Sequence, residues 1–435
     1  MITDTIVAPA TPEGRAGVSI IRMSGASSLR LIKKLTNQNK KIPNRKPVFL
    51  PVFTKSKTLI DKAIITYYKK PRSYTGEDII EVSCHGNPLI VRSIIKTLCF
   101  YGARISNPGE FTMRSFLNGK MDLVQAEAVS SLIESRSLAS TKAHNKILAG
   151  SLTKELNKIK NNILHVVSTI EYELDISEEK TNKKTQVKIH KTIKNSALCC
   201  EELLKNYTHK KNHFYTKVVI CGEPNVGKST LLNSLIGQEK AIVSPQPGTT
   251  RDRVEETLEI DNTPITIIDT AGIRKTQNKI EKEGLKRTKE AIKEADILIH
   301  VVTKGSSQPK KNKNKENILV FNKSDLFKKP NCFFKASSIS AKNGTGIKQI
   351  KNKLENKIKE KNENTPSVFL TTQRQFTHIK NCHNYLKKTQ KTPIYEPEII
   401  SLDLREALKE IDSLLGKTTT DDILNLVFSS FCVGK

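Results

Sequence analysis

The sequence predicts a multidomain α/β plus α fold, in which a second α/β domain is inserted into a helical bundle that follows an N-terminal α/β domain. Residues 1–118 contain short β-branched runs broken by Gly and Pro. Residues 119–212 and 366–435 space their apolar side chains as helices do, and residues 213–365 alternate strand-like with helix-like runs. We therefore expect the two helical segments to pack together as one bundle.

In the N-terminal domain, the runs "GVSIIRMSG", "KAIITYY" and "EDIIEVSCHG" predict strands, and a helix is predicted near "PLIVRSIIKTLCFYG". In the first helical segment, "KMDLVQAEAVSSLIESRSLAS" and "LTKELNKIKNNILHVVSTIEYELDI" predict long helices. The polar stretch "SEEKTNKKTQVKIHK" predicts a loop or a frayed connection. Helical spacing returns in "REALKEIDSLLG" and "DDILNLVFSSF", and the low-complexity stretch "KGSSQPKKNKNKEN" predicts a surface loop.

Composition fits a folded chain of several domains, with 435 residues, 37% hydrophobic and 27% charged. We find no apolar run long enough to cross a bilayer. The start "MITDTIVAPATPEG" has no basic stretch followed by an apolar one, so a secretory signal is not expected. We therefore expect a cytoplasmic protein with no membrane association.

The chain is strongly basic, with 73 Lys and Arg against 44 Asp and Glu and a net charge of +29. Such a charge attracts polyanions, and RNA is the specific interpretation. Compositional drift is the alternative, because Lys and Asn are spread through the whole chain.

The cysteines do not predict a structural metal site, because no two of them form a C-x-x-C pair. In a cytosolic chain they are expected to stay reduced, and most of them to be buried as small apolar side chains. The eight are Cys84, Cys99, Cys199, Cys200, Cys221, Cys332, Cys382 and Cys432.

The segment "GEPNVGKS" has the pattern G-x-x-x-x-G-K-S, after the apolar run "KVVIC" and before the helical run "TLLNSLI". This context predicts a P-loop. Gly222 and Gly227 let the backbone wrap around phosphates, and Lys228 reaches the β- and γ-phosphates. The Ser229 hydroxyl is placed to bind Mg²⁺.

The segment "ILVFNKSD" ends a predicted strand with N-K-x-D and indicates guanine as the base. The Asp325 carboxylate accepts hydrogen bonds from guanine N1–H and the exocyclic amine, a pair of donors that adenine lacks. Asn322 holds the loop and touches N7. The later segment "SISAK" places Ser340, Ala341 and Lys342 at the base. A P-loop ATPase, the alternative, does not account for N-K-x-D.

Two further segments complete a GTPase signature. In "ITIIDTAG", Asp269 orders the Mg²⁺ shell through water and the Gly272 N–H meets the γ-phosphate. In "PGTTRD", the Thr250 hydroxyl binds Mg²⁺ when the γ-phosphate is present. Ras-like enzymes carry a water-orienting Gln after D-T-A-G, whereas this chain has Ile273, so another group is needed to assist hydrolysis.

With these motifs, the chain resembles the MnmE (TrmE) family of tRNA modification GTPases. The resemblance runs through "DTIVAPATPEGRAGVSIIRMSG", "SYTGEDIIEVSCHGNP", "PGEFTMRSFLNGKMDLVQAEAV", the GTPase motifs and the terminal "CVGK". It implies an N-terminal folate-binding α/β domain (1–118) that dimerises, a helical domain in two parts (119–212 and 366–435), and an inserted Ras-like P-loop G domain (213–365).

The resemblance also implies the partners and the reaction. Family members form a homodimer and, with the FAD-dependent protein MnmG (GidA), a heterotetramer. Together they add a carboxymethylaminomethyl or aminomethyl group to C5 of the wobble uridine of certain tRNAs. The carbon comes from a tetrahydrofolate derivative, in its 5-formyl or 5,10-methylene form. GTP is hydrolysed with Mg²⁺ and K⁺.

In this family a potassium ion takes the part of an arginine finger. The resemblance implies that its ligands are Asn225, Ser244, Gln246 and Thr249. Ser244 stands where the family usually has Thr. The resemblance also implies Glu281, in "IEKEG", as the carboxylate that orients water; a solvated helix residue is the alternative.

The motifs and the resemblance together place the GTP contacts in the P-loop, the two switch segments and the base-binding loops. These residues are Asn225, Val226, Gly227, Lys228, Ser229, Thr230, Ser244, Pro245, Gln246, Pro247, Gly248, Thr249, Thr250, Asp269, Thr270, Ala271, Gly272, Asn322, Lys323, Asp325, Ser340, Ala341 and Lys342.

The resemblance implies a folate site formed by Arg22, Glu81, Lys120 and Lys435; solvated surface positions are the alternative for each. Cys432 has the place of a prenylated cysteine in a C-a-a-X tail, but Gly434 and Lys435 fit that box poorly. The approach "TTTDDILNLVFSSF" is acidic and helical, which predicts a docked tail. Cys432 is then a residue of the modification chemistry or a buried, inert thiol.

Two other classes of protein share some of these features. An RNA-binding ribosome-assembly GTPase would have the same G-domain motifs and basic charge, but not the N-terminal blocks or "FCVGK". A lipid-anchored signalling GTPase would have a free, prenylatable tail and an N-terminal G domain. Folate binding distinguishes the first alternative from the modification GTPase.

Overall fold

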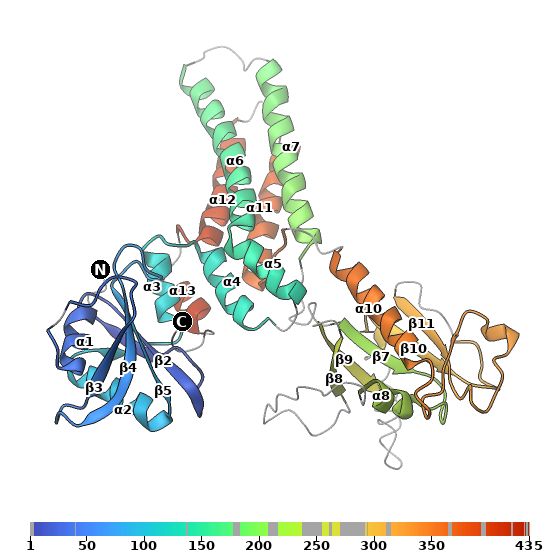
Figure 1. The fold of residues 1–435 in the computed structure, drawn as a ribbon. Coiled ribbons are helices and arrows are strands. Elements are labelled where there is room, and N and C mark those ends of the chain that lie inside the picture. Colours follow the sequence, from blue (N-terminus) through green and yellow to red (C-terminus); the bar gives the residue numbers. More distant parts are fainter. Residues whose placement is uncertain are drawn as a thin grey trace, which may run out of the picture. The chain divides into compact units, whose positions relative to one another are not determined.

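The computed structural model divides the chain into two units (Figure 1). Unit 1 consists of Met1–Ile133, His144–Tyr207 and Val368–Lys435, and unit 2 of Glu134–Ala143 and Thr208–Ser367. The structure describes residues 4–39, 41–135, 138–176, 183–207, 216–236, 255–260, 263–269, 292–293, 295–309, 315–363, 368–392, 397–418, 421–429, 431 and 434. The domain bounds predicted from sequence stay predictions.

Unit 1 begins with a six-stranded sheet in the order β3-β4-β5-β2-β1-β6. Neighbouring strands are antiparallel except β1 and β6, which are parallel. The strands are β1 (Ile6–Pro9), β2 (Ala16–Ser24), β3 (Val48–Phe53), β4 (Leu59–Tyr68), β5 (Ile79–Gly86) and β6 (Arg104–Ile105). The three strands predicted from sequence are confirmed as β2, β4 and β5.

The two faces of this sheet differ because side chains alternate along each strand. Ile21, Met23 and Val82 lie in a buried cluster with α1 (Ser28–Thr36) and α2 (Pro88–Phe100). Their strand neighbours Arg22 and Glu81 pair across β2 and β5 and so point to the other face. The predicted helix in "PLIVRSIIKTLCFYG" is α2, which Asn87 caps by accepting a hydrogen bond from the Leu89 N–H at 2.9 Å.

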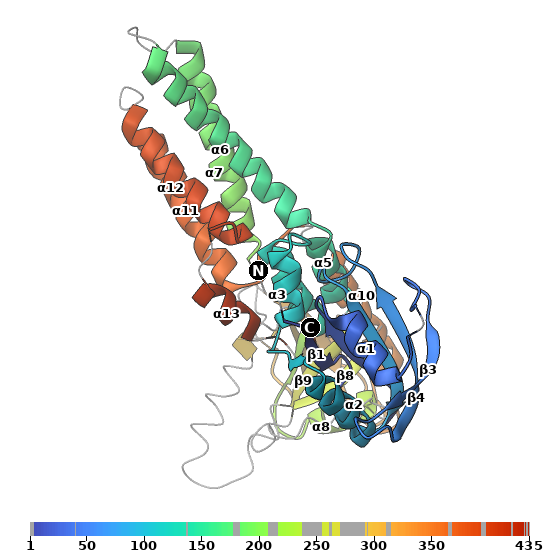
Figure 2. The ribbon, with the colours of Figure 1, turned by 90° about the vertical axis from the view of Figure 1, so that its left-hand side faces the viewer.

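The helical part of unit 1 contains α6, α7, α11 and α12, which lie side by side in both views (Figures 1 and 2). Contacts join α6 to α7, α7 to α11, α11 to α12, and α12 to α6, so segments before and after the G domain pack as one bundle, as predicted. The helices of unit 1 in this part are α4 (Leu123–Ile133), α6 (Ser151–Ile176), α7 (Lys183–Lys205), α11 (Gln373–Lys391), α12 (Pro397–Leu415) and α13 (Asp421–Ser429). The helix α5 (Leu138–Leu148) begins in unit 2 and ends in unit 1.

The prediction of a loop or frayed connection in "SEEKTNKKTQVKIHK" is wrong for its second half, which is helical from Lys183 onward. Ile189 and Ile193 recur one turn apart and are buried, whereas Lys188 and Lys191 are exposed. Ile189 and Ile193 thus extend the buried face that Ala197, Cys200 and Leu203 form further along α7, which makes the lysine-rich start an amphipathic helix. Residues 177–182 lie outside the described part of the chain.

The end of the chain packs onto α3 (Glu110–Leu117) and α4. Leu424, Phe428 and Phe431 form a buried cluster with residues of α4, including Leu123. Gly109, just before α3, has φ +68, and a Cβ there would lie 2.6 Å from the Phe428 carbonyl oxygen. Only glycine permits this approach, which fixes α13 against the start of α3.

Unit 2 is a six-stranded sheet in the order β12-β11-β10-β7-β9-β8, parallel except for the β8–β9 pair. Its elements include β7 (Thr216–Cys221), α8 (Lys228–Ile236), β8 (Glu255–Ile260), β9 (Thr263–Asp269), β10 (Ile297–Val302), β11 (Glu316–Phe321), β12 (Ser337–Ser338) and α10 (Ile347–Glu363). Apolar residues of β7, β10 and β11 pack against α8 and α10. The predicted alternation of strands and helices is confirmed.

The seven described cysteines are free thiols; four are buried, two half-buried, and Cys332 is exposed. Cys432 lies outside the described residues. Among the helices that the structure describes, none is both long and apolar enough to cross a membrane.

Candidate functional sites

The P-loop joins β7 to α8 and is held close to β10. Gly222 has φ +156, and a Cβ there would lie 2.3 Å from the Val301 carbonyl oxygen. Lys228 begins α8, and its ammonium group donates to the carbonyl oxygens of Gly222 at 3.1 Å and Glu223 at 2.7 Å. The Lys228 charge therefore lies over the loop, beside the positive end of the α8 dipole, where an anion is favoured.

Asn322 connects the P-loop to the base-binding segments. It is buried; its Nδ2 donates to the Val226 carbonyl oxygen at 2.8 Å, and its Oδ1 accepts from the Ala341 N–H at 3.0 Å. Gly227 has φ +92, and a Cβ there would lie 2.3 Å from Asn322 Nδ2. One amide side chain thus fixes two loops that are far apart in sequence.

Asp325 and its neighbours form the candidate base site at the end of β11. A hydrogen bond from Ser340 holds the pKa of the Asp325 carboxyl below its ordinary value, helped by Lys342 and Lys323 and opposed by burial. Asp325 is therefore an anionic acceptor at neutral pH. The structure brings it together with Ser340, Ala341 and Asn322, as the motifs predict.

The remaining predicted nucleotide residues divide into two groups. Asn225 lies in the P-loop with φ 60, and Asp269 ends β9 in register with Ile220 of β7, at the edge where the P-loop begins. Ser229 and Thr230 lie in the first turn of α8. The following lie outside the described residues: Ser244, Pro245, Gln246, Pro247, Gly248, Thr249, Thr250, Thr270, Ala271, Gly272 and Glu281.

One contact of the P-loop is not predicted by any motif in the sequence. The Glu223 carboxylate accepts from the Ser307 hydroxyl at 2.6 Å and from the Ser307 N–H at 3.2 Å. These bonds lower the pKa of the Glu223 carboxyl. They attach the P-loop to the segment after β10, which the sequence predicts as a surface loop.

A second candidate site lies in unit 1, on the sheet face opposite α1 and α2. Arg22 Nε and Nη2 donate to Glu81 Oε1 at 3.0 and 2.8 Å, and the Tyr68 hydroxyl donates to Glu81 Oε2 at 3.4 Å. The Arg22 guanidinium lies 5.8 Å from the centre of the Tyr74 ring and 6.0 Å from that of Phe111. These aromatic neighbours were not predicted.

The C-terminal tail reaches this second site. Arg22 Nη1 donates to the Gly434 carbonyl oxygen at 3.5 Å. Gly434 has φ +97, and a Cβ there would lie 2.1 Å from the Pro9 carbonyl oxygen. Phe431 and Gly434 are both buried: Phe431 packs with residues of α4 and α13, and Gly434 lies against Pro9 of β1. The side chains of Cys432 and Lys435 lie outside the described residues.

Lys120 lies at the rim of the second site. Its ammonium group donates to the Pro71 carbonyl oxygen at 3.0 Å. Its Cγ and Cδ atoms lie so close to Gly76 that a Cβ added there would be 3.5 Å from them. The structure thus brings Arg22 and Glu81 into direct contact. It places Lys120 on the neighbouring loop, where its ammonium group contacts Pro71.

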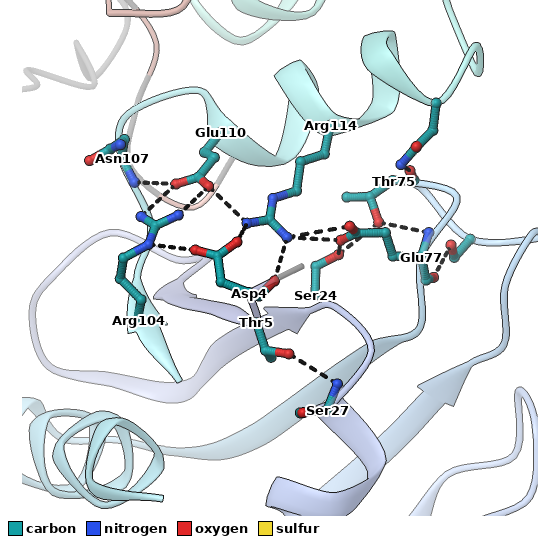
Figure 3. A network of polar contacts seen from close by, with 12 residues as sticks. Asp4, Thr5, Ser24, Ser27, Thr75, Glu77, Arg104, Asn107, Glu110 and Arg114 are labelled. Atoms are coloured by element: carbon teal, nitrogen blue, oxygen red, sulfur yellow. Dashed lines mark hydrogen bonds and ion pairs between the residues drawn. The ribbon is translucent and has the colours of Figure 1, made fainter. Parts of the chain in front are cut away.

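A network of ion pairs centred on Arg114 connects α3 to the N-terminal sheet (Figure 3). Arg114, on α3, is 1% exposed. It donates to Asp4 Oδ1 at 2.7 Å, to Glu110 Oε1 at 2.9 Å, and to both Glu77 oxygens at 3.2 and 3.3 Å. Arg104 donates to Glu110 at 2.6 and 3.0 Å. The network ties α3 to the start of β1 and to the segment before β5.

Comparison with known proteins adds to this geometry. A family profile described as "GTP-binding protein TrmE N-terminus" matches residues 5–120, and one described as "MnmE helical domain" matches residues 123–432. The tRNA modification GTPase MnmE of Aquifex aeolicus is 36% identical over 99% of this chain and 100% of its own length. That of Pseudothermotoga lettingae is 38% identical over the same shares of the two chains.

Among solved structures, the G domain of the T. maritima FeoB iron transporter is 25% identical over 33% of this chain and 99% of its own, with a TM-score of 0.25. The P-loop at the end of a parallel strand, joined through Asn322 to the N-K-x-D segment, defines a P-loop GTPase. Family profiles and full-length relatives go further: the chain belongs to the MnmE (TrmE) family of tRNA modification GTPases.

Proposed function

We propose that this GTPase acts on the wobble uridine of certain tRNAs, adding a carboxymethylaminomethyl or aminomethyl group to C5 with a one-carbon unit from a tetrahydrofolate. The observation that carries this proposal is the contact between Arg22 and the C-terminal tail at Gly434, which joins the family's N-terminal and C-terminal motifs in one site. The proposed setting is a cytoplasmic homodimer, which forms a heterotetramer with FAD-dependent MnmG (GidA).

At the nucleotide site, each residue is proposed to have one task. Lys228 neutralises the β- and γ-phosphates, Ser229 and Thr250 bind Mg²⁺, and Asp325 selects guanine. Mg²⁺ held by these residues would stabilise the negative charge that develops on the phosphate groups. The Lys228 contacts with P-loop carbonyls support this, because they hold the ammonium group over the loop.

Potassium is proposed to supply the charge that an arginine finger supplies elsewhere. Asn225 in the P-loop, with Ser244, Gln246 and Thr249, would hold it, and Glu281 would orient water. Asn225 supports this because its positive φ departs from the usual backbone conformation and asparagine tolerates that region. Left-handed residues other than glycine are more common at ligand-binding sites than elsewhere.

GTP hydrolysis is expected to be at least about 10-fold faster in KCl than in NaCl at the same ionic strength, because an arginine finger in the same place contributes about 10³–10⁵. The Asn225→Ala variant is expected to keep the NaCl rate and lose the stimulation. Equal rates of the wild type in both salts would contradict a potassium site.

In unit 1, Arg22, Glu81, Lys120 and Lys435 are proposed to bind the tetrahydrofolate derivative, with Cys432 nearby for the modification chemistry. The Arg22–Glu81 pair presents a bidentate donor and a carboxylate acceptor, which suits a heterocycle with adjacent donors and acceptors. Both side chains remain about one-fifth exposed, so a ligand can reach them.

The Gly434→Ala variant is expected to weaken tetrahydrofolate binding at least about 10-fold, because its Cβ would displace the tail from Pro9 and Arg22. Binding is measured by equilibrium dialysis on the full chain. Gly102→Ala is the matched control, since Gly102 also has a positive φ but no atom within 4 Å of its Cβ position. GTP hydrolysis should be unchanged in both. Wild-type affinity in Gly434→Ala would mean that the docked tail takes no part in the site.

An RNA-binding ribosome-assembly GTPase is the second candidate, favoured by the basic charge of +29. It predicts GTP-dependent binding to ribosomal RNA and no tetrahydrofolate binding. The dialysis experiment therefore separates the two candidates.

A further inference from the structure

We infer that the loop between β4 and β5 is a docking surface for the phosphate backbone of an RNA strand, beside the Arg22–Glu81 site. Its cations are Lys69, Lys70 and Arg72, which we call the cationic loop. This inference rests on the proposed function, since it names the surface by which the tRNA would approach the modification site.

The cationic loop lies next to the second site along the chain. It directly follows Tyr68, whose hydroxyl contacts Glu81, and Glu81 contacts Arg22. Arg45 donates a hydrogen bond to the Arg72 carbonyl oxygen at 2.7 Å, and its backbone N–H donates to the Tyr67 carbonyl oxygen at 2.7 Å. A strand held by the cationic loop would therefore pass the edge of the Arg22–Glu81 pair.

The loop is held in one shape before any partner binds. Lys120 donates to the Pro71 carbonyl oxygen, and Ser115 donates to the Tyr74 carbonyl oxygen at 2.7 Å. Asn118 donates to the Thr75 carbonyl oxygen at 2.7 Å, and Thr75 is fully buried. A preformed loop loses less entropy on binding than a free one.

The charges of the loop are available to a partner, because nearby acids are already engaged. Glu77 contacts Arg114 and Glu81 contacts Arg22. Asp78 accepts hydrogen bonds from the Tyr67 hydroxyl and the Lys70 N–H. Within the described parts of the chain, the side chains of Lys69, Lys70 and Arg72 form no ion pair, and all three are exposed.

The arrangement suits an RNA strand because it combines phosphate-binding cations with aromatic rings. The run "YYKKPRSY" places Tyr68 and Tyr74, both half-exposed, on either side of the cations. Proteins that take a base out of single-stranded RNA hold the backbone with cations and stack the base on aromatic or guanidinium planes. Arg22 and Tyr68 provide such planes beside the loop, whereas Tyr74 packs against the buried cluster of Ile6, Ala8 and Phe111.

The test compares two triple variants of the full-length chain. The first is Lys69→Gln with Lys70→Gln and Arg72→Gln. The control is Arg30→Gln with Lys57→Gln and Lys96→Gln, which removes the same charge from exposed positions of the same sheet-containing part of unit 1, on α1, the β3–β4 turn and α2. Binding of an unmodified tRNA transcript is measured by filter retention over a series of salt concentrations, and circular dichroism checks folding.

The cationic-loop variant is expected to bind tRNA at least about 10-fold more weakly at 100 mM salt. The slope of log affinity against log salt should fall by about 2, since each lost single-strand phosphate contact removes about 0.7. The control should change affinity less than about twofold.

Equal losses in the two triple variants would overturn the inference and leave the proposed function standing. A cationic-loop variant that binds tRNA normally but binds polyglutamylated tetrahydrofolate poorly would also overturn the inference. The cations of the loop would then bind the carboxylates of the cofactor. A wild-type chain that binds no tRNA would instead contradict the proposed function.

Discussion

The Asp325→Asn variant is expected to prefer xanthosine triphosphate to GTP. The carboxylate accepts two hydrogen bonds, which match guanine N1–H and its exocyclic amine. An amide accepts one and donates one, which matches the N1–H and 2-oxo group of xanthine. The ratio of kcat/KM for the two nucleotides should change at least about 10²-fold, since a site built to hydrogen-bond a substrate group rejects an analogue that lacks it.

The control for this exchange is Asp325→Ala, which loses the acceptor and offers no donor. It should bind both nucleotides weakly. Asn322 stays in place in both variants and keeps the P-loop attached to the base-binding loop. A guanine preference retained in Asp325→Asn would mean that another group selects the base.

The nucleotide site could be predicted from sequence because its motifs are contiguous and follow strands. "GEPNVGKS" and "NKSD" each stand at the end of a predicted strand, and parallel strands bring such ends to one edge. The bonds of Asn322 to Val226 and Ala341 then follow from the topology. The switch segments with Ser244, Thr250 and Glu281 lie outside the described residues, so the roles assigned to them stay predictions.

The second site could not be derived from local pattern. Arg22 and Glu81 meet because β2 pairs with β5, a pairing that no spacing in the sequence specifies, and only the family resemblance pointed to them. No motif in the sequence pointed to Tyr74 and Phe111, whose rings lie next to Arg22. The start of α7 at Lys183 could likewise not be predicted, because the sequence around it is polar. Burial of Ile189 by neighbouring helices outweighs the effect of the surrounding lysines.

The ion network centred on Arg114 also escaped prediction, because Asp4, Glu77 and Arg114 are far apart in sequence. Arg114→Met is expected to lower the free energy of unfolding of unit 1 by about 3 kcal/mol, since it removes the arginine that contacts Glu77 and leaves Asp4 and Glu110 with Arg104 alone. The chain has no Trp, so urea unfolding is followed by circular dichroism. Arg92→Met, whose pair with Glu13 is exposed, should cost about 0–1 kcal/mol.

The pH dependence of this loss in unfolding free energy tests whether the ion network is its cause. Burial raises the pKa of the Glu110 and Asp4 carboxyls, but hydrogen bonds and charges of Arg104 and Arg114 outweigh it, so both pKa values lie below their ordinary range. Carboxyls with lowered pKa stabilise the folded chain above their unfolded pKa values of about 3.9–4.3, and this stabilisation is lost as pH falls through the folded values. The wild type should therefore lose stability below about pH 5, and Arg114→Met less steeply.

The difference in free energy between wild type and Arg114→Met is thus expected to be largest near neutral pH and to shrink in acid. A cavity left by the shorter side chain would give a loss that does not change with pH. A pH-independent difference would therefore assign the effect to packing, not to the charges of Asp4 and Glu110. Because Arg114 also holds Glu77, near the start of β5, the variant should weaken tetrahydrofolate binding while GTP hydrolysis in unit 2 is unchanged.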